Sequence, residues 1–238
     1  MFVNTLIHLF YPRRCPICGQ IVAQAQGYIH ESCRKTLVYV RKPVCMRCGK
    51  PIYSPLQEYC FDCSKKAAVS AFDGGAAVWV YTKEMMASIA QYKYHGKKEY
   101  ARFFANEAVR LYGSWMMQCR PDCITAVPLN RKKMLGRGFN QAALVARRIG
   151  RQLKIPVDEH LLVRSRFTAP QKELTPEQRL RNLQRAFGPG KNAGRYERIL
   201  LVDDIYTTGS TMQICSMILK KSGAQHVWIL SLCIGSDY

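Results

Sequence analysis

The chain has 238 residues, and its 36 Lys and Arg against 16 Asp and Glu give a formal net charge of +20. This length fits one medium-sized domain and a small one, and the charge favours polyanionic partners such as nucleotides, nucleic acid or an acidic membrane surface. The apolar residues 1–10 are too short to cross a bilayer, and no later stretch approaches a transmembrane run. We therefore expect a cytoplasmic protein whose 11 cysteines stay reduced, which favours metal binding over disulfides.

An internal repeat of metal-binding units occupies the first part of the chain. Each unit reads Cys-x-x-Cys, eleven residues, and then Cys or His-x-x-Cys, and the second unit follows the first at an offset of 30 residues. Because zinc takes four thiolate or imidazole ligands in a tetrahedron, the repeat predicts two closed structural zinc sites. The offset makes His30 a predicted ligand, since it matches Cys60. The predicted ligands are Cys15, Cys18, His30 and Cys33 in the first site and Cys45, Cys48, Cys60 and Cys63 in the second.

A larger domain with alternating strands and helices follows the metal-binding repeat. We place the boundary near residues 64–73, which gives domains at 1–68 and 69–238. Apolar runs and helical stripes alternate along the second domain, and this order predicts a doubly wound α/β fold. The expected strands are 74–81, 123–127, 157–163, 199–202 and 227–234, and the expected helices are 83–95, 99–118, 137–153 and 210–221.

The stretch 199–211 combines features that suit different parts of one ligand. A buried strand at 199–202 is followed by Asp203 and Asp204, and then by a Thr-Thr-Gly-Ser-Thr run that opens a helix. The helix N-terminus offers free N–H groups to a phosphate, whereas the two carboxylates suit sugar hydroxyls or Mg²⁺. A 5-phosphorylated ribose meets all of these demands. The plain alternative is a strand–turn–helix with an acidic N-cap.

This stretch resembles the 5-phosphoribosyl-1-pyrophosphate (PRPP) motif of type I phosphoribosyltransferases. The resemblance implies that Asp203 and Asp204 hold the ribose hydroxyls and that Mg²⁺ accompanies PRPP. By position, it also implies that Arg131 and Lys132 bind the pyrophosphate, although a solvated basic turn is an equal alternative there. The implied 5-phosphate cradle consists of Thr207, Thr208, Gly209, Ser210 and Thr211.

Nearly the whole chain resembles the ComF competence-protein family, in particular its members with a double zinc ribbon. The resemblance implies an N-terminal double zinc ribbon followed by a doubly wound, parallel-sheet, type I phosphoribosyltransferase-like domain. Besides the acidic motif, it rests on residues 12–18 (PRRCPIC), 92–96 (YKYHG), 127–129 (VPL) and 137–142 (RGFNQA), and on scattered matches at 171–187.

Two functions follow from this resemblance. The first is a PRPP-binding, zinc-containing protein that handles single-stranded DNA in natural transformation and works with the DNA-uptake machinery. Tyr92 and Tyr94 are candidate stacking faces for such a strand, and a basic polar stretch at 164–185 adds positive charge. The alternative is a catalytic phosphoribosyltransferase, in which Asp203 or Asp204 stabilises the developing charge. The segment 164–187 shows no recognisable pattern for selecting a base, so the acceptor stays unknown.

Overall fold

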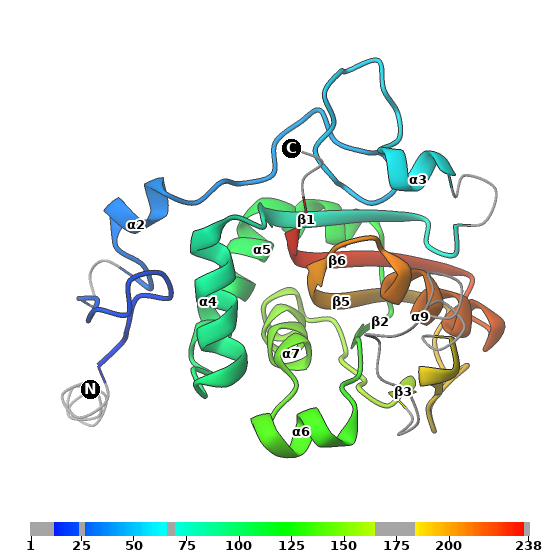
Figure 1. The fold of residues 1–238 in the computed structure, drawn as a ribbon. Coiled ribbons are helices and arrows are strands. Elements are labelled where there is room, and N and C mark those ends of the chain that lie inside the picture. The colour runs from blue at the N-terminus through cyan, green and yellow to red at the C-terminus, as the bar shows by residue number, and fades with distance from the viewer. Residues whose placement is uncertain (1–11, 24–26, 66–69, 165–183, 236–238) are drawn as a thin grey trace, which may run out of the picture.

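Four parallel strands form the central sheet of the computed structural model, which describes residues 12–23, 27–65, 70–164 and 184–235 (Figure 1). The strand order is β1-β6-β5-β2, and every neighbouring pair is parallel. Their apolar runs are buried because the sheet is covered on both faces. The strands are β1 (Gly74–Val80), β2 (Cys123–Ala126), β5 (Arg198–Tyr206) and β6 (His226–Ile234).

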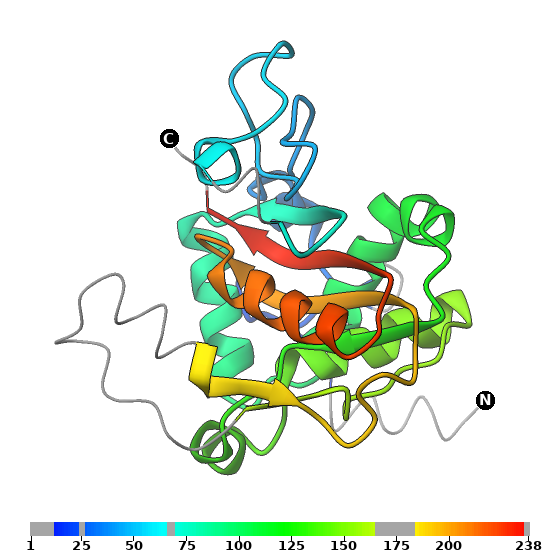
Figure 2. The same cartoon turned by 90° about the vertical axis from the view of Figure 1, so that its right-hand side faces the viewer.

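The helices divide between the two faces of the sheet, which confirms the expected doubly wound fold. Leu200 and Val202 of β5 pack into a core with α4 (Lys83–Tyr94), α5 (Tyr100–Gln118) and α7 (Gln141–Leu153). Ile199 and Leu201, on the opposite face, pack into a second core with α9 (Ser210–Lys221). Figure 2 shows α9 in front of the sheet, with the other three helices behind it.

The elements between residues 131 and 189 differ from the predicted ones. The strand expected at 157–163 begins only at Leu162, and this β3 (Leu162–Arg164) pairs antiparallel with β4 (Phe187–Pro189) outside the main sheet. The helix expected at 137–153 begins four residues later, at Gln141 of α7, because a separate helix, α6 (Arg131–Arg137), precedes it and ends at Gly138 with φ 72°. The Asn140 side chain then caps α7 by accepting hydrogen bonds from the first backbone N–H groups.

The metal-binding repeats pack against opposite sides of the larger domain. Cys15 of the first ribbon belongs to the core that includes α5, whereas Cys45 of the second ribbon belongs to the core that includes α9. The linker between the ribbons runs beside β1. Val40 donates to the Val78 carbonyl at 3.0 Å, and Val80 donates to the Val38 carbonyl at 2.9 Å. The linker thereby covers a sheet edge that would otherwise present unpaired backbone groups. The ribbons also contain two short helices, α2 (Glu31–Lys35) and α3 (Phe61–Lys65).

Glycines at equivalent repeat positions have different surroundings. Gly19 and Gly49 both have a positive φ, 73° and 76°, which lets each Cys-x-x-Cys turn close tightly. A Cβ on Gly49 would lie 2.8 Å from the Gly75 carbonyl oxygen, whereas a Cβ on Gly19 would have no neighbour within 4 Å. The second ribbon is therefore seated directly on the backbone of β1.

Candidate functional site

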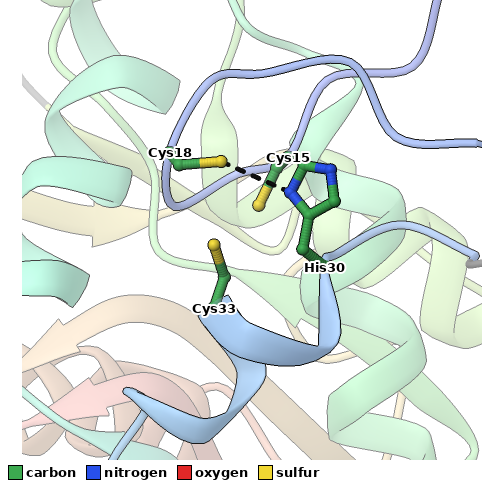
Figure 3. A group of neighbouring side chains, drawn as sticks. All are labelled: Cys15, Cys18, His30 and Cys33. Carbon is green, nitrogen blue, oxygen red and sulfur yellow. Dashed lines mark hydrogen bonds between the residues drawn. The ribbon is translucent and has the colours of Figure 1, made fainter.

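The first four predicted metal ligands converge on one point. Their ligand atoms all lie within 4.8 Å of one another, and the side chains point toward a common centre in Figure 3. The Cys18 sulfur lies 3.4 Å from His30 Nδ1, while His30 Nε2 faces the Ile21 carbonyl oxygen at 3.0 Å. An Nε2–H donated to that carbonyl leaves Nδ1 free for a metal and fixes the ring. Cys15, Cys18, His30 and Cys33 thus fit a tetrahedral zinc ion.

The second cluster has four buried thiols, and their sulfur atoms lie within 4.8 Å of one another. The sulfur atoms of Cys48 and Cys60 are 3.6 Å apart. A zinc–sulfur bond of about 2.3 Å gives a tetrahedral edge of about 3.8 Å, so this spacing suits zinc. Both clusters supply four ligands and leave no open position, which is typical of structural sites. Cys45, Cys48, Cys60 and Cys63 make up the second set.

The acidic pair lies on β5, just past the end of its neighbour β2. The last residue of β2, Ala126, pairs with Val202, but β5 continues beside β6 as far as Tyr206. The strand predicted to end at residue 202 is therefore longer than expected. Asp203 and Asp204 are part of that strand, directly after the last residue that pairs with β2. This is the carboxyl end of the sheet, where α/β proteins bind ligands.

Asp204 is buried in a network that reaches two helices. Its carboxylate accepts a hydrogen bond from Lys93 Nζ of α4 at 2.9 Å and one from Gln141 Nε2 of α7 at 2.7 Å. The Tyr92 hydroxyl donates to the Gln141 carbonyl at 2.8 Å, which steadies the start of α7. Sequence reasoning did not assign Lys93 or Gln141 to this site. The signal was present, because both lie in the family segments 92–96 and 137–142.

Asp203 faces the other side of the strand, since successive side chains of a strand alternate. It lies near Arg164 and near Cys215 of α9, and its Oδ1 accepts the Asp204 backbone N–H at 2.8 Å. Burial, with the neighbouring Asp204 charge, raises the pKa of Asp203 to about 8. The two carboxylates are adjacent in sequence but differ in surroundings, and only Asp204 has an ion pair among the described residues.

The Thr-Thr-Gly-Ser-Thr run forms the turn into α9. Thr207 and Thr208 are exposed, and the Thr208 and Ser210 hydroxyl oxygens lie 3.0 Å apart. Gly209 is the N-cap with φ 74°, and a Cβ there would lie 2.1 Å from the Tyr206 hydroxyl oxygen, so the turn excludes any larger residue. The helix begins at Ser210, as the sequence predicted. Thr211 lies in its first turn.

The predicted pyrophosphate residues lie in the first turn of α6 and are exposed, although the sequence indicated a loop. The Asn130 side chain caps this helix by accepting the Lys133 backbone N–H at 2.8 Å. Partial desolvation and the charges of Arg164, Arg137 and Lys93 lower the pKa of Lys133. Lys133 of α6 is therefore close to Lys93, which contacts Asp204, and to Arg164, which lies near Asp203. Sequence reasoning did not assign Lys133 to the site. The residues that it assigned to pyrophosphate are Arg131 and Lys132.

The expected stacking tyrosines have different environments. Tyr92 is fully buried between Phe104 and Phe139, so the prediction that it stacks on bases is wrong. Tyr94 is 68% exposed, and the Arg137 guanidinium lies over its ring at 4.9 Å. Most of the predicted basic stretch, namely Arg166, Lys172, Arg179 and Arg181, lies outside the described residues.

Comparisons with known proteins agree with this architecture. A family model described as a double zinc ribbon domain matches residues 6–64. Competence protein F of Haemophilus influenzae is 29% identical, over 94% of this chain and 97% of its own. The DNA utilization protein YhgH of Salmonella typhimurium is 30% identical, over 94% of this chain and 98% of its own. Competence protein ComFC of Bacillus subtilis is 26% identical, over 81% of this chain and 78% of its own.

A search of solved structures found an allosteric regulatory enzyme of purine biosynthesis, with a TM-score of 0.39 and 14% identity, over 60% of this chain and 29% of the enzyme. Among the described residues, no helix combines the length and the apolar character that crossing a membrane requires. The ribbon repeat, the parallel sheet and 30% identity across nearly the full length of a relative together show that the chain belongs to the ComF competence-protein family.

Proposed function

We propose that the protein binds PRPP at the carboxyl edge of its sheet and handles single-stranded DNA during natural transformation. The observation that carries the PRPP half is the succession of two acids, an exposed threonine turn and a helix N-terminus on one edge. Membership of a family whose relatives are named for competence and DNA utilization supports the DNA half. The two zinc ribbons have a structural role.

The turn before α9 suits the 5-phosphate. The helix has 12 residues, no acidic residue in its first turn and no side-chain cap at Gly209. Its first N–H groups and its positive dipole end are therefore available to an anion. The hydroxyls of Thr208 and Ser210 stand beside that helix start and can donate to phosphate oxygens.

The acidic pair suits the ribose. Each carboxylate oxygen has two acceptor positions, so Asp204 can accept a sugar hydroxyl while it keeps Lys93 and Gln141. Asp203 precedes it on the same strand, beyond the end of β2. Mg²⁺, bound with PRPP, takes oxygen ligands and would neutralise the diphosphate, for which Arg131 and Lys132 are the proposed cationic partners.

Calorimetry tests the sugar assignment directly. Zinc-loaded protein is titrated with PRPP and Mg²⁺, and the double variant Asp203→Asn with Asp204→Asn is compared with Glu84→Gln, which removes an exposed acid on α4. We expect the double variant to lose about 1–3 kcal/mol of binding free energy per charged contact, and the control to keep its affinity. Unchanged affinity in the double variant would rule out the sugar assignment.

The same samples separate binding from catalysis. A catalytic phosphoribosyltransferase releases pyrophosphate from PRPP when its acceptor is present, and Asp204→Asn should abolish that release. A protein that only binds PRPP gives heat of binding without pyrophosphate across a broad panel of bases and amines. We expect the second result, because the segment 164–187 carries no recognisable pattern for selecting a base.

The DNA half predicts strong dependence on salt. A protein that neutralises phosphates displaces counterions, so the logarithm of affinity for a single strand should fall linearly with the logarithm of salt concentration. Fluorescence anisotropy with a labelled oligonucleotide at several salt concentrations measures this slope. An affinity that stays constant with ionic strength would contradict the electrostatic account.

A further inference from the structure

Two adjoining cavities lie where the first zinc ribbon meets the helices of the larger domain. The first has a volume of about 550 Å³ and is lined by the ribbon, the start of α5 and one residue of α7. The second has a volume of about 400 Å³ and is lined by the Cys18–Gly19 turn and by Ala87 and Gln91 of α4. We call their combined surface the ribbon–helix groove. The cavities share Arg14, Pro16, Lys97 and Tyr100.

The ribbon–helix groove carries a large uncompensated positive charge. Five cations line it, and Glu99 is the only acid among its described lining residues. None of the five forms an ion pair with an acid in the part of the chain that the structure describes. The segments 1–11 and 24–26, which flank the lining residues in sequence, contain no Asp or Glu. The five cations are Arg13, Arg14, Lys97, Arg102 and Arg148.

An aromatic ring and a backbone carbonyl, rather than carboxylates, hold three of these arginines in place. The guanidinium carbons of Arg13 and Arg102 lie 5.0 and 5.1 Å from the centre of the Tyr28 ring. A guanidinium held on an aromatic face keeps its N–H edges free to donate. Arg14 donates to the Gly19 carbonyl at 3.1 Å, which ties it to the first zinc-binding turn. The guanidinium groups of these three arginines are thus held in position by groups of the protein itself.

The distribution of charge favours a polymer over a single phosphate. A site for one phosphate gathers its donors around one point, but these cations come from the ribbon, the loop before α5, α5 and α7. All five line the first cavity, and Arg14 and Lys97 also line the second. We infer that the ribbon–helix groove binds the phosphate backbone of single-stranded nucleic acid. This inference rests on the proposed DNA function and gives it a location.

The ribbon–helix groove is separate from the acidic pair but uses the same helices. Gln141, which holds Asp204, is the first residue of α7, and Arg148 lies seven residues further along, about 10 Å at 1.5 Å per residue. On α4, Lys93 contacts Asp204 while Gln91 lines the groove. None of the described residues that line the groove belongs to the acidic pair or to the turn 207–211, so a strand in the groove should leave that site to PRPP, and the two sites can be tested independently.

Paired charge-removal variants test the inference. Arg102→Gln with Arg148→Gln removes two groove cations, and Lys191→Gln with Lys221→Gln removes two exposed lysines elsewhere on the surface. Binding of a labelled single-stranded oligonucleotide is measured over a salt series. For the groove variant we expect affinity to fall at least about tenfold and the salt slope to fall by about 1.4, which is about 0.7 for each lost phosphate contact. The lysine variant should keep a slope near that of the unchanged protein.

The outcomes separate this inference from the proposed function. Equal losses in the two variants would overturn the groove while DNA binding stands, whereas no salt-dependent binding by the unchanged protein would overturn the DNA function itself. Retained PRPP binding heat in the groove variant supports separate sites, and its loss would contradict them. Zinc content and melting temperature report folding. If the double variant does not fold, Arg102→Gln alone, at an exposed position, should still lower the slope by about 0.7.

Discussion

Asp203 and Asp204 are neighbours in the chain, but their carboxyl groups have different partners and different burial. Asp204 is compensated by Lys93 at 2.9 Å and by the Gln141 amide. For Asp203, burial and the Asp204 charge raise the pKa to about 8, far above the ordinary value of 3.8. The two acids of the site therefore differ, because Asp204 has an ion-pair partner whereas burial raises the pKa of Asp203. Such perturbed pairs are typical of functional sites.

The raised pKa of Asp203 predicts how stability depends on pH. Because the folded protein holds this proton more tightly than the unfolded chain, stability should fall as pH rises from about 4 to about 8 and then level off. Denaturant unfolding between about pH 6 and pH 9 should show a loss on the order of 2 kcal/mol that disappears in Asp203→Asn. Glu84→Gln, at an exposed position, should keep the pH dependence of the unchanged protein. If Asp203→Asn lost the same unfolding free energy between about pH 6 and pH 9, the pH dependence would belong to another group.

The Lys93–Asp204 pair predicts a non-additive result. Lys93→Met leaves the buried Asp204 charge without its cation and should cost about 3–5 kcal/mol of unfolding free energy. Adding Asp204→Asn removes that charge while its side-chain oxygen can still accept from Gln141, so the double variant should be more stable than Lys93→Met alone. A double-mutant cycle by denaturant unfolding measures the coupling. Purely additive effects would show that the pair is not coupled.

At the scale of elements, the two ribbons share a ligand pattern but attach differently. The repeat in sequence predicted both metal clusters, because ligand spacing depends on local chain geometry. It could not predict that one ribbon packs beside α5 while the other is seated on β1, because this depends on which surfaces meet in the folded chain. The close approach of Gly49 to the Gly75 carbonyl shows where the second ribbon contacts β1.

The different seats of the ribbons predict unequal effects of one substitution. Gly19→Ala and Gly49→Ala both place a side chain at positive φ, which costs about 1–2 kcal/mol. Gly49→Ala also forces a Cβ to within 2.8 Å of the Gly75 carbonyl oxygen, which should add about 1–3 kcal/mol. Thermal unfolding of the two zinc-loaded variants measures the difference. Equal melting temperatures would mean that the second ribbon does not press on β1.

At the scale of the whole molecule, the sequence predicted the parallel sheet and the helix after the acidic pair, because buried strands and helix starts leave strong local patterns. The sequence did not predict that β5 continues through both acids. The apolar run that indicated this strand ends before Asp203, but the backbone continues to pair with β6 as far as Tyr206. Sequence reasoning also missed Lys93 and Gln141. Both lie in segments that resemble the family, but each contacts Asp204 across more than 60 residues of chain, and those segments do not show which residue they contact.

One structure determination tests the central claim most directly, namely that the carboxyl edge of this sheet is a phosphoribosyl site. Crystals of the zinc-loaded protein with PRPP and Mg²⁺ should show the 5-phosphate at the turn 207–211 and the ribose hydroxyls beside Asp203 and Asp204. Density for PRPP in the ribbon–helix groove or elsewhere, with this edge vacant, would contradict the account.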